Sequence, residues 1–311
     1  VNPENSEWRI EGADMGFVVE GGATMFGRAA TRIPDVDGDA IDDIIISAPH
    51  INYDEPDAIT GHGAAYIFSV RTAAEQLAAP VLDDTQAIGS IVGDAVSDNV
   101  AWDLTRMHDG RVALSVAERD LATGGVYLIS DLTTLDTHLS DADAGYVGDT
   151  INEQVGYDVT DAVGTGDAIL AIGSPGWETF RGRVSFVEEI DDERTMSTVP
   201  AAHLEGCWVG ANTGKTVESH PGPDPFGQNE RWYVITAPGA SVATNEDGLT
   251  YILTQSDFDE AINTECEEII DFHFGHDDDG DGYYQGDDCD DTAPSIYPHA
   301  PETCGNGIDE D

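Results

Sequence analysis

One pattern recurs four times along the 311-residue chain and constrains its fold more than any other feature. It is an apolar run that closes on a small residue, usually followed by proline, and the copies end 68, 58 and 63 residues apart. The four runs are residues 44–49 (IIISAP), 112–117 (VALSVA), 169–175 (ILAIGSP) and 233–238 (YVITAP). A polar loop and a second apolar segment that begins at or next to glycine follow each run, at residues 63–68, 125–129, 182–187 and 248–253.

A third element precedes each run and usually joins an apolar residue to glycine. It reads Phe26-Gly27, then a degenerate Val100-Ala101, then Val155-Gly156 and Thr213-Gly214. Each copy therefore supplies several short strands separated by turns. One small sheet cannot cover both of its own faces, so successive sheets must pack radially, as in a propeller, or in line, as in a solenoid. We expect an all-β domain over residues 1–255, with the four runs as inner strands and almost no helix outside residues 72–79.

The first copy contains a loop that is suited to a cation. Asp35, Asp37, Asp39 and Asp43 stand at positions 1, 3, 5 and 9, and the Ile41 carbonyl stands at position 7. Calcium takes six to eight oxygen ligands, and alternating carboxylates in a tight loop supply them. We expect one calcium here, because the equivalent loops of the other copies have lost these ligands. The alternative is an acidic turn without an ion, and Ala40 stands where related loops often carry glycine.

Phe26-Gly27, this loop and the ISAP of residues 46–49 together resemble the FG-GAP repeat of integrin α-subunit propellers and related bacterial surface proteins. The resemblance is strong in the first copy, is weaker but in the same order in the other three, and covers residues 8–255. It implies a β-propeller, commonly of seven blades. The chain has four copies, so further blades of such a ring are missing, too divergent to recognise, or supplied by another chain.

A second acidic region begins at His276 with the letters HDDDGDGY. Asp277, Asp279 and Asp281 repeat the 1, 3, 5 spacing, the Tyr283 carbonyl stands at position 7, and Asp288 stands at position 12, as in an EF-hand loop. We expect at least one calcium at these residues, and Asp290 is a candidate ligand for another. A disordered acidic tail is the alternative.

Residues 277–311 also resemble the Asp- and Cys-rich MopE-type metal-binding motif of bacterial surface proteins. The resulting expectation is an FG-GAP domain over 1–255, a linker over 256–275 and an acidic calcium-binding segment over 276–311. The even number of cysteines suggests two disulfides, Cys289 with Cys304 and Cys207 with Cys266, in an oxidising compartment. Buried free thiols are the alternative.

Charge excludes whole classes of partner. Twelve Lys and Arg residues face 62 Asp and Glu residues, and no Lys or Arg follows Arg231. A net charge of −50 repels nucleic acid and anionic membranes, so neither is an expected partner. A halophilic or marine source explains the same acidity, and this explanation is compatible with calcium binding.

No apolar run approaches the ~18–20 residues that span a bilayer. We interpret the start at Val1 as a mature form that has lost an export signal.

The chain has none of the HExxH, GxSxG or GxGxxG motifs, and the sequence at 210–216 resembles a phosphate-binding loop only at its end. We therefore expect a secreted or cell-surface calcium-binding protein, not an enzyme, that acts in adhesion or ligand binding. Its expected partner is a protein or glycan at a cell surface, or copies of itself. The alternative is a structural subunit of a surface layer or filament assembled through calcium. A propeller-based polysaccharide-active enzyme is a weaker alternative.

Overall fold

The computed structural model describes residues 9–10, 25–50, 62–70, 81–82, 86–95, 98–133, 137–165, 168–190, 193–197, 201–221, 231–240 and 248–254. Within them the chain is strand and turn, which confirms the all-β prediction. Helix is limited there to α2 (Arg119–Ala122), α3 (Trp177–Phe180), the 3-10 turn η3 (Leu139–Asp141) and the single 3-10 residue Gln86. None of these helices is long and apolar enough to cross a membrane. The insertion at 72–79 lies outside the described residues.

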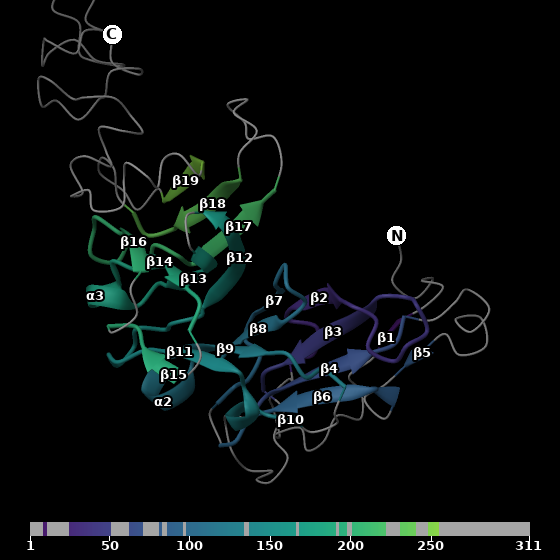
Figure 1. Ribbon diagram of the computed structural model, residues 1–311. Helices are drawn as coiled ribbons and strands as arrows, with labels where there is room; N and C mark the ends of the chain where they lie inside the picture. The colour runs from purple at the N-terminus through teal and green to yellow at the C-terminus, as the bar shows by residue number, and fades with distance from the viewer. Residues whose placement is uncertain are drawn as a thin grey trace, which may run out of the picture.

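Four sheets follow one another in chain order, each with antiparallel neighbours among its consecutive strands (Figure 1). The first holds β2 (Ala30–Ile33), β3 (Asp43–Ala48), β4 (Ala64–Phe68) and β6 (Gly89–Val92). The second holds β7 (Leu104–Arg106), β8 (Val112–Ser115), β9 (Gly125–Ile129) and β11 (Ala144–Val147). The third holds β12 (Asp158–Thr165), β13 (Ala168–Ser174), β14 (Arg183–Glu188) and β16 (Ala201–Glu205). The fourth holds β17 (Thr216–His220), β18 (Trp232–Ala237) and β19 (Leu249–Thr254).

Short parallel strands extend this pattern at the outer edges. The chain between the third and fourth strands of one sheet reaches the outer strand of the preceding sheet. In this way β10 (Thr137–His138) pairs with β6, and β15 (Glu193–Thr195) pairs with β11. The pairing of β5 (Val81–Leu82) with β1 (Arg9–Ile10) is of the same kind. Backbone hydrogen bonds of this kind tie the second sheet to the first and the third sheet to the second.

The four apolar runs form the second strand of each sheet, β3, β8, β13 and β18. Each pairs on both sides, so β3 lies between β2 and β4, and most of its side chains are buried. The prediction that these runs are the inner strands is wrong. Successive sheets contact one another chiefly through their first strands, β2 with β7, β7 with β12 and β12 with β17. The runs of β3, β8 and β13 are apolar because these central strands are buried on both faces, whereas buried and half-buried residues alternate along β18.

Buried clusters fill the spaces between neighbouring sheets. The residue pairs that illustrate the three junctions are Ile45 with Leu114, Leu128 with Leu170, and Phe186 with Tyr233. The rings of the last pair meet edge to face, with centroids 5.3 Å apart. Stacking of this kind lets each small sheet bury a face that it cannot cover alone.

The apolar-glycine element makes the turn that enters each sheet. In all four copies the residues on both sides of its apolar member have positive φ: Met25 and Gly27, Asn99 and Ala101, Gln154 and Gly156, Asn212 and Gly214. The residue between the two positive-φ positions bridges back to the preceding sheet, as in Gly63 with Val100, Gly124 with Val155 and Gly182 with Thr213. A Cβ on Gly124 would lie 2.3 Å from the Val155 carbonyl oxygen, so glycine is required by space as well as by its φ of +77°.

Candidate metal centre

The loop between β2 and β3 gathers the carboxylates that its spacing predicted. Asp35, Asp37 and Asp39 each place an oxygen within 4.8 Å of the others, and all three residues are exposed. Oxygen atoms at this separation can share one cation, because calcium lies 2.3–2.6 Å from each of its ligands.

Backbone amides hold these side chains in place. Asp35 accepts hydrogen bonds from the amides of Gly38 (2.7 Å), Asp39 (3.2 Å) and Ala40 (2.8 Å). Asp37 accepts one from Asp39, and Asp39 accepts one from Ile41. The amides of Ala40 and Gly38 lower the pKa of Asp35, so its carboxylate is ionised at neutral pH. The loop thus carries a preformed negative site.

Asp43 occupies a different environment at the start of β3. It is fully buried, and its two oxygens accept from the amides of Val36 (2.7 Å) and Val70 (3.4 Å). Burial raises its pKa, and the charges of Asp37 and Asp35 raise it further. Asp43 is not among the three carboxylates that converge, so its role as a ligand stays a prediction, as does that of the Ile41 carbonyl. In the structure, the Asp43 side chain links the loop at Val36 to Val70, which follows β4.

Two residues of the loop have left-handed backbone. Gly38 has a φ of +86° and Ala40 a φ of +68°. Glycine adopts such a conformation freely, whereas alanine is strained there by about 1–2 kcal/mol. This is the position at which the sequence departs from the FG-GAP pattern. The loop holds its shape despite that cost.

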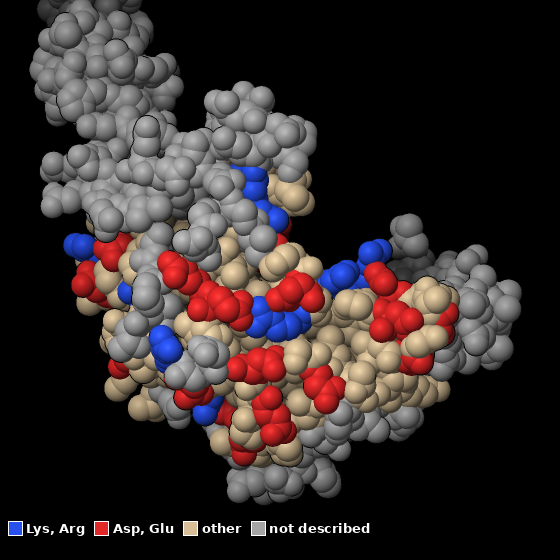
Figure 2. Space-filling view, in the orientation of Figure 1, with Lys and Arg blue, Asp and Glu red and all other residues tan. Residues whose placement is uncertain are grey.

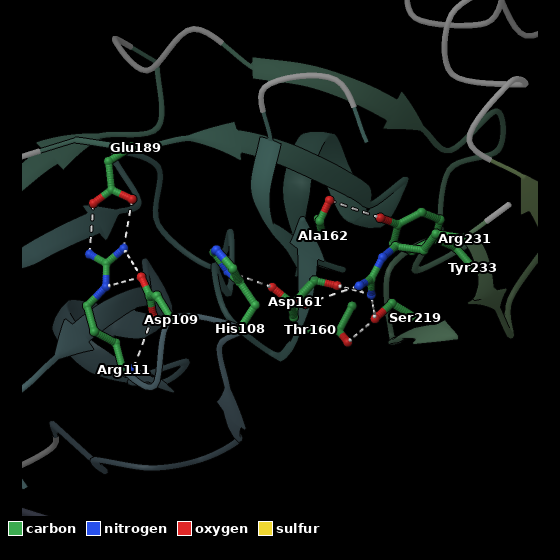
Figure 3. Close-up of polar contacts among 10 residues, drawn as sticks. All are labelled: His108, Asp109, Arg111, Thr160, Asp161, Ala162, Glu189, Ser219, Arg231 and Tyr233. Carbon is green, nitrogen blue, oxygen red and sulfur yellow. Dashed lines mark hydrogen bonds and ion pairs between the residues drawn. The ribbon is translucent and has the colours of Figure 1, made fainter. Parts of the chain in front are cut away.

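The equivalent turn of the second sheet, between β7 and β8, carries an arginine that pairs with two carboxylates. Arg111 donates to both carboxylate oxygens of Glu189, at 2.8 and 2.7 Å, and its Nε donates to Asp109 at 2.7 Å (Figure 3). The guanidinium lowers the pKa of Asp109. A fork of this kind neutralises two carboxylates without an ion.

A second arginine, Arg231, links the third and fourth sheets. Arg231 contacts Asp161 at 3.3 Å and Ser219 at 3.0 Å, and His108 lies 3.9 Å from the other Asp161 oxygen (Figure 3). Sequence reasoning missed both arginines. The sequence contained one indication of their role. Lys and Arg are scarce in this chain, so an arginine next to a strand of the repeat is a stronger candidate for a structural ion pair than it would be in a chain of ordinary composition.

Sequence reasoning also missed a carboxyl pair at the junction of the second and third sheets. Asp103 and Asp158 share a hydrogen bond, which requires one proton. The other oxygens accept from the next sheet, Asp103 from Val159 at 2.9 Å and Asp158 from Val217 at 3.1 Å. Burial, followed by the charge of Asp103, raises the pKa of Asp158 to about 9. The pair therefore links three first strands.

A row of rings and cations lies at the adjacent positions of the same turns. Arg28 lies 4.0 Å from the ring centroid of Trp102, Trp102 lies against Tyr157 with ring centroids 5.7 Å apart, and Lys215 lies 3.7 Å from the Tyr157 centroid. These four residues come from four successive sheets. Trp102 thus packs between neighbouring sheets.

On the face that Figure 2 shows, acidic side chains cover more of the described surface than basic ones, and the few basic ones lie among them. The remaining predicted ligands lie outside the described residues: Asp277, Asp279, Asp281, Tyr283, Asp288 and Asp290. Three of the four cysteines do so as well, and the half-buried Cys207 is the one within them. Both predicted disulfides therefore stay predictions.

Comparison with known proteins supports the second part of the sequence interpretation. Residues 288–311 match the family model Cu-binding MopE, described as “Putative metal-binding motif”. The match does not extend to residues 8–255, so the FG-GAP resemblance there rests on the quoted residues and on the repeated geometry. No curated protein matches the chain. The chain is thus similar at its end to a metal-binding motif.

Proposed function

We propose that this chain is a secreted or cell-surface calcium-binding protein that acts in adhesion or ligand binding. In this proposal the four sheets belong to an FG-GAP-type, propeller-like array, because each enters through the same turn and packs on the next through its first strand. A protein or glycan at a cell surface is the proposed partner, and no catalytic role is assigned. The adhesive role rests on the FG-GAP resemblance.

The observation that carries the metal-binding part is the convergence of Asp35, Asp37 and Asp39. Their donors are carboxylate oxygens in an exposed loop, which suits a hard cation. Calcium is favoured over magnesium because magnesium demands near-ideal octahedral geometry, whereas a loop of alternating carboxylates accommodates the larger ion more easily.

The metal of the C-terminal segment needs its own argument, because the matching family is named for copper. Copper prefers imidazole and sulfur donors. Residues 277–311 contain one histidine, His299, and two cysteines, whereas aspartates recur throughout. A carboxylate-rich segment with few nitrogen and sulfur donors supports calcium as the metal.

Isothermal titration tests the metal site directly. Wild-type protein, a D37A/D39A variant and an E178A/E218A control are titrated with calcium and, separately, with copper. The control removes the same number of charges from side chains that are 58% and 64% exposed and lie outside the loop. We expect the loop variant to lose one calcium, and the control to lose none. An unchanged calcium stoichiometry in D37A/D39A would exclude the loop site.

The adhesive role is tested separately. Protein on a glycan and cell-surface protein array is compared in calcium and in chelator. Calcium-dependent retention that D37A/D39A loses supports the proposal. Calcium-driven assembly into large particles, measured by sedimentation, with no array binding indicates a structural subunit instead.

A further inference from the structure

Most of the large apolar side chains that the described part of the chain exposes lie at one end of the sheets. Leu121, Ile151, Phe180 and Val209 are 73%, 60%, 45% and 69% exposed, and the fifth such residue, Ile252, lies on β19. Single apolar residues on a surface are ordinary, whereas several in one place mark an interaction site. The arrangement of their loops decides which case applies.

The four residues belong to two kinds of connection. Leu121 and Phe180 lie between the second and third strands of a sheet, and Ile151 and Val209 lie between a fourth strand and the first strand of the next sheet. Because neighbouring strands are antiparallel, both kinds of connection lie at the same end of the sheets, opposite to the loop that gathers the three aspartates. The two helices that carry Leu121 and Phe180, α2 and α3, lie on the same side of Figure 1.

Backbone hydrogen bonds place these connections next to one another. Each of three amides donates to a carbonyl of the neighbouring connection: Asn152 to Leu121 at 3.2 Å, Gly176 to Glu153 at 3.2 Å, and Asn212 to Phe180 at 2.8 Å. The connections therefore follow one another without a gap along this end. We call the exposed side chains of Leu121, Ile151, Phe180 and Val209 the apolar band.

Two members of the band have a backbone conformation that suits other residues better. Leu121 and Phe180 both have a φ of +64°. Glycine and asparagine tolerate this left-handed region, whereas large side chains are sterically disfavoured there. Burial of the side chain would offset that cost, but both side chains are exposed. A residue that is unfavourable for the fold and gains no burial from it points to a role outside the fold.

The charge around the band favours one kind of partner. Residues 118–123, 148–154, 176–182 and 205–212 include six acidic residues and two arginines. Both arginines already lie near carboxylates, Arg119 at 3.5 Å from Asp98 and Arg181 at 3.9 Å from Glu178. The band is therefore surrounded by net negative charge. An apolar centre with a charged rim is typical of protein interfaces, and such a rim favours a partner of opposite charge.

We propose that the apolar band binds a protein partner whose surface presents apolar side chains flanked by lysine and arginine. A second copy of the chain fits less well, because each copy carries a net charge of −50. A glycan fits less well too, because its hydroxyl groups need hydrogen-bonding partners that Leu121, Ile151 and Val209 do not supply. The inference rests on the adhesive part of the proposed function, since it names the partner, but not on calcium.

Titration with defined peptides tests the band in the full chain. The probe is a synthetic amphipathic peptide of leucine and lysine, and two matched peptides replace leucine by serine or lysine by glutamate. The loop variant is L121N/F180N. Asparagine tolerates the left-handed backbone, so this variant should unfold at the same denaturant concentration as wild type or at a higher one. The control I252T removes an apolar side chain of similar exposure from β19, and threonine suits a strand.

We expect wild type and I252T to bind the leucine–lysine peptide equally, and L121N/F180N to bind it about ten-fold more weakly or less. Both matched peptides should bind more weakly than the probe. Equal binding of the probe by L121N/F180N, equal binding of the serine peptide, or no binding by wild type overturns the proposal. Reduced stability of L121N/F180N overturns it as well, because the two side chains would then serve the fold.

Other occupants of the band are separate outcomes. Wild-type binding to phosphatidylcholine vesicles that L121N/F180N loses would assign the band to a lipid surface. Self-association in sedimentation that this variant loses would assign it to a second copy. Either result overturns the proposal.

The glycan and protein array distinguishes failure of this inference from failure of the proposed function. Equal retention of wild type and L121N/F180N would overturn the inference and leave the adhesive role intact. No retention of wild type, together with the expected peptide binding, would overturn the adhesive role and support the band as a binding surface.

Discussion

Replacing Ala40 with glycine should strengthen the metal loop. Ala40 has a φ of +68°, which costs alanine about 1–2 kcal/mol relative to an unstrained residue. Glycine removes that strain. It also lowers the free energy of unfolding by about 0.4–1 kcal/mol, because it gives the unfolded chain more conformational freedom. The difference lies between about 0 and 1.6 kcal/mol, and its central value of about 0.8 kcal/mol in favour of glycine corresponds to about a four-fold change in an equilibrium constant.

The gain is measured as the free energy of unfolding by denaturant titration in saturating calcium, together with the calcium dissociation constant. The matched control is A30G, because Ala30 is exposed, lies in β2 and has no positive φ. Glycine in a strand destabilises by about 0.5–1 kcal/mol, so the same substitution should have the opposite sign there. If A40G lowers stability as much as A30G, the left-handed strain at Ala40 is not what limits the loop.

Three other predictions follow from the sheets and the tail. Because the folded-state pKa of Asp158 lies above its unfolded value, stability from the carboxyl pair should fall as pH rises between about 4 and 9, and D158N should flatten that slope in denaturation measured against pH. The variant G124A should lose more than the ~1–2 kcal/mol of strain expected for G210A in chemical denaturation, because both positions have positive φ but only Gly124 faces backbone atoms. Chelation of calcium should make residues 276–311 sensitive to protease before the sheets are, because few apolar side chains are available there to form a core. Limited proteolysis followed by mass spectrometry measures this. Equal resistance with and without chelator would mean that protein contacts order the segment.

Much of the fold could be predicted because the repeat depends on residues that are close together in the sequence. The central strands β3, β8 and β13 are buried on both faces, so they appear in the sequence as continuous apolar runs. The glycines at the start of the third strands could also be recognised in the sequence, because no other residue fits their backbone conformation. Even the degenerate Val100-Ala101 keeps the turn, because Ala101 adopts the left-handed conformation with a φ of +62°.

The inner strands could not be predicted from pattern alone. Strands such as β7 and β17 are short and mix polar with apolar residues, and their position follows from how whole sheets pack. The pairing of Asp103 with Asp158 has the same origin, because the two residues belong to different sheets and are 55 positions apart. Arg111 and Glu189 meet across 78 positions.

At the metal loop, spacing predicted Asp35, Asp37 and Asp39 because neighbouring carboxylates in a tight turn depend on local geometry. Asp43 was placed in the same set by position, yet its oxygens accept bonds from Val36 and Val70. Val70 lies beyond β4, so no count along the loop could reveal that contact.

Diffraction from crystals grown in calcium tests the central claim most directly, through the anomalous signal of the ion. The proposal predicts a calcium peak about 2.3–2.6 Å from carboxylate oxygens of Asp35, Asp37 and Asp39. Ordered density for this loop, in saturating calcium, with no anomalous peak among the three carboxylates would contradict it.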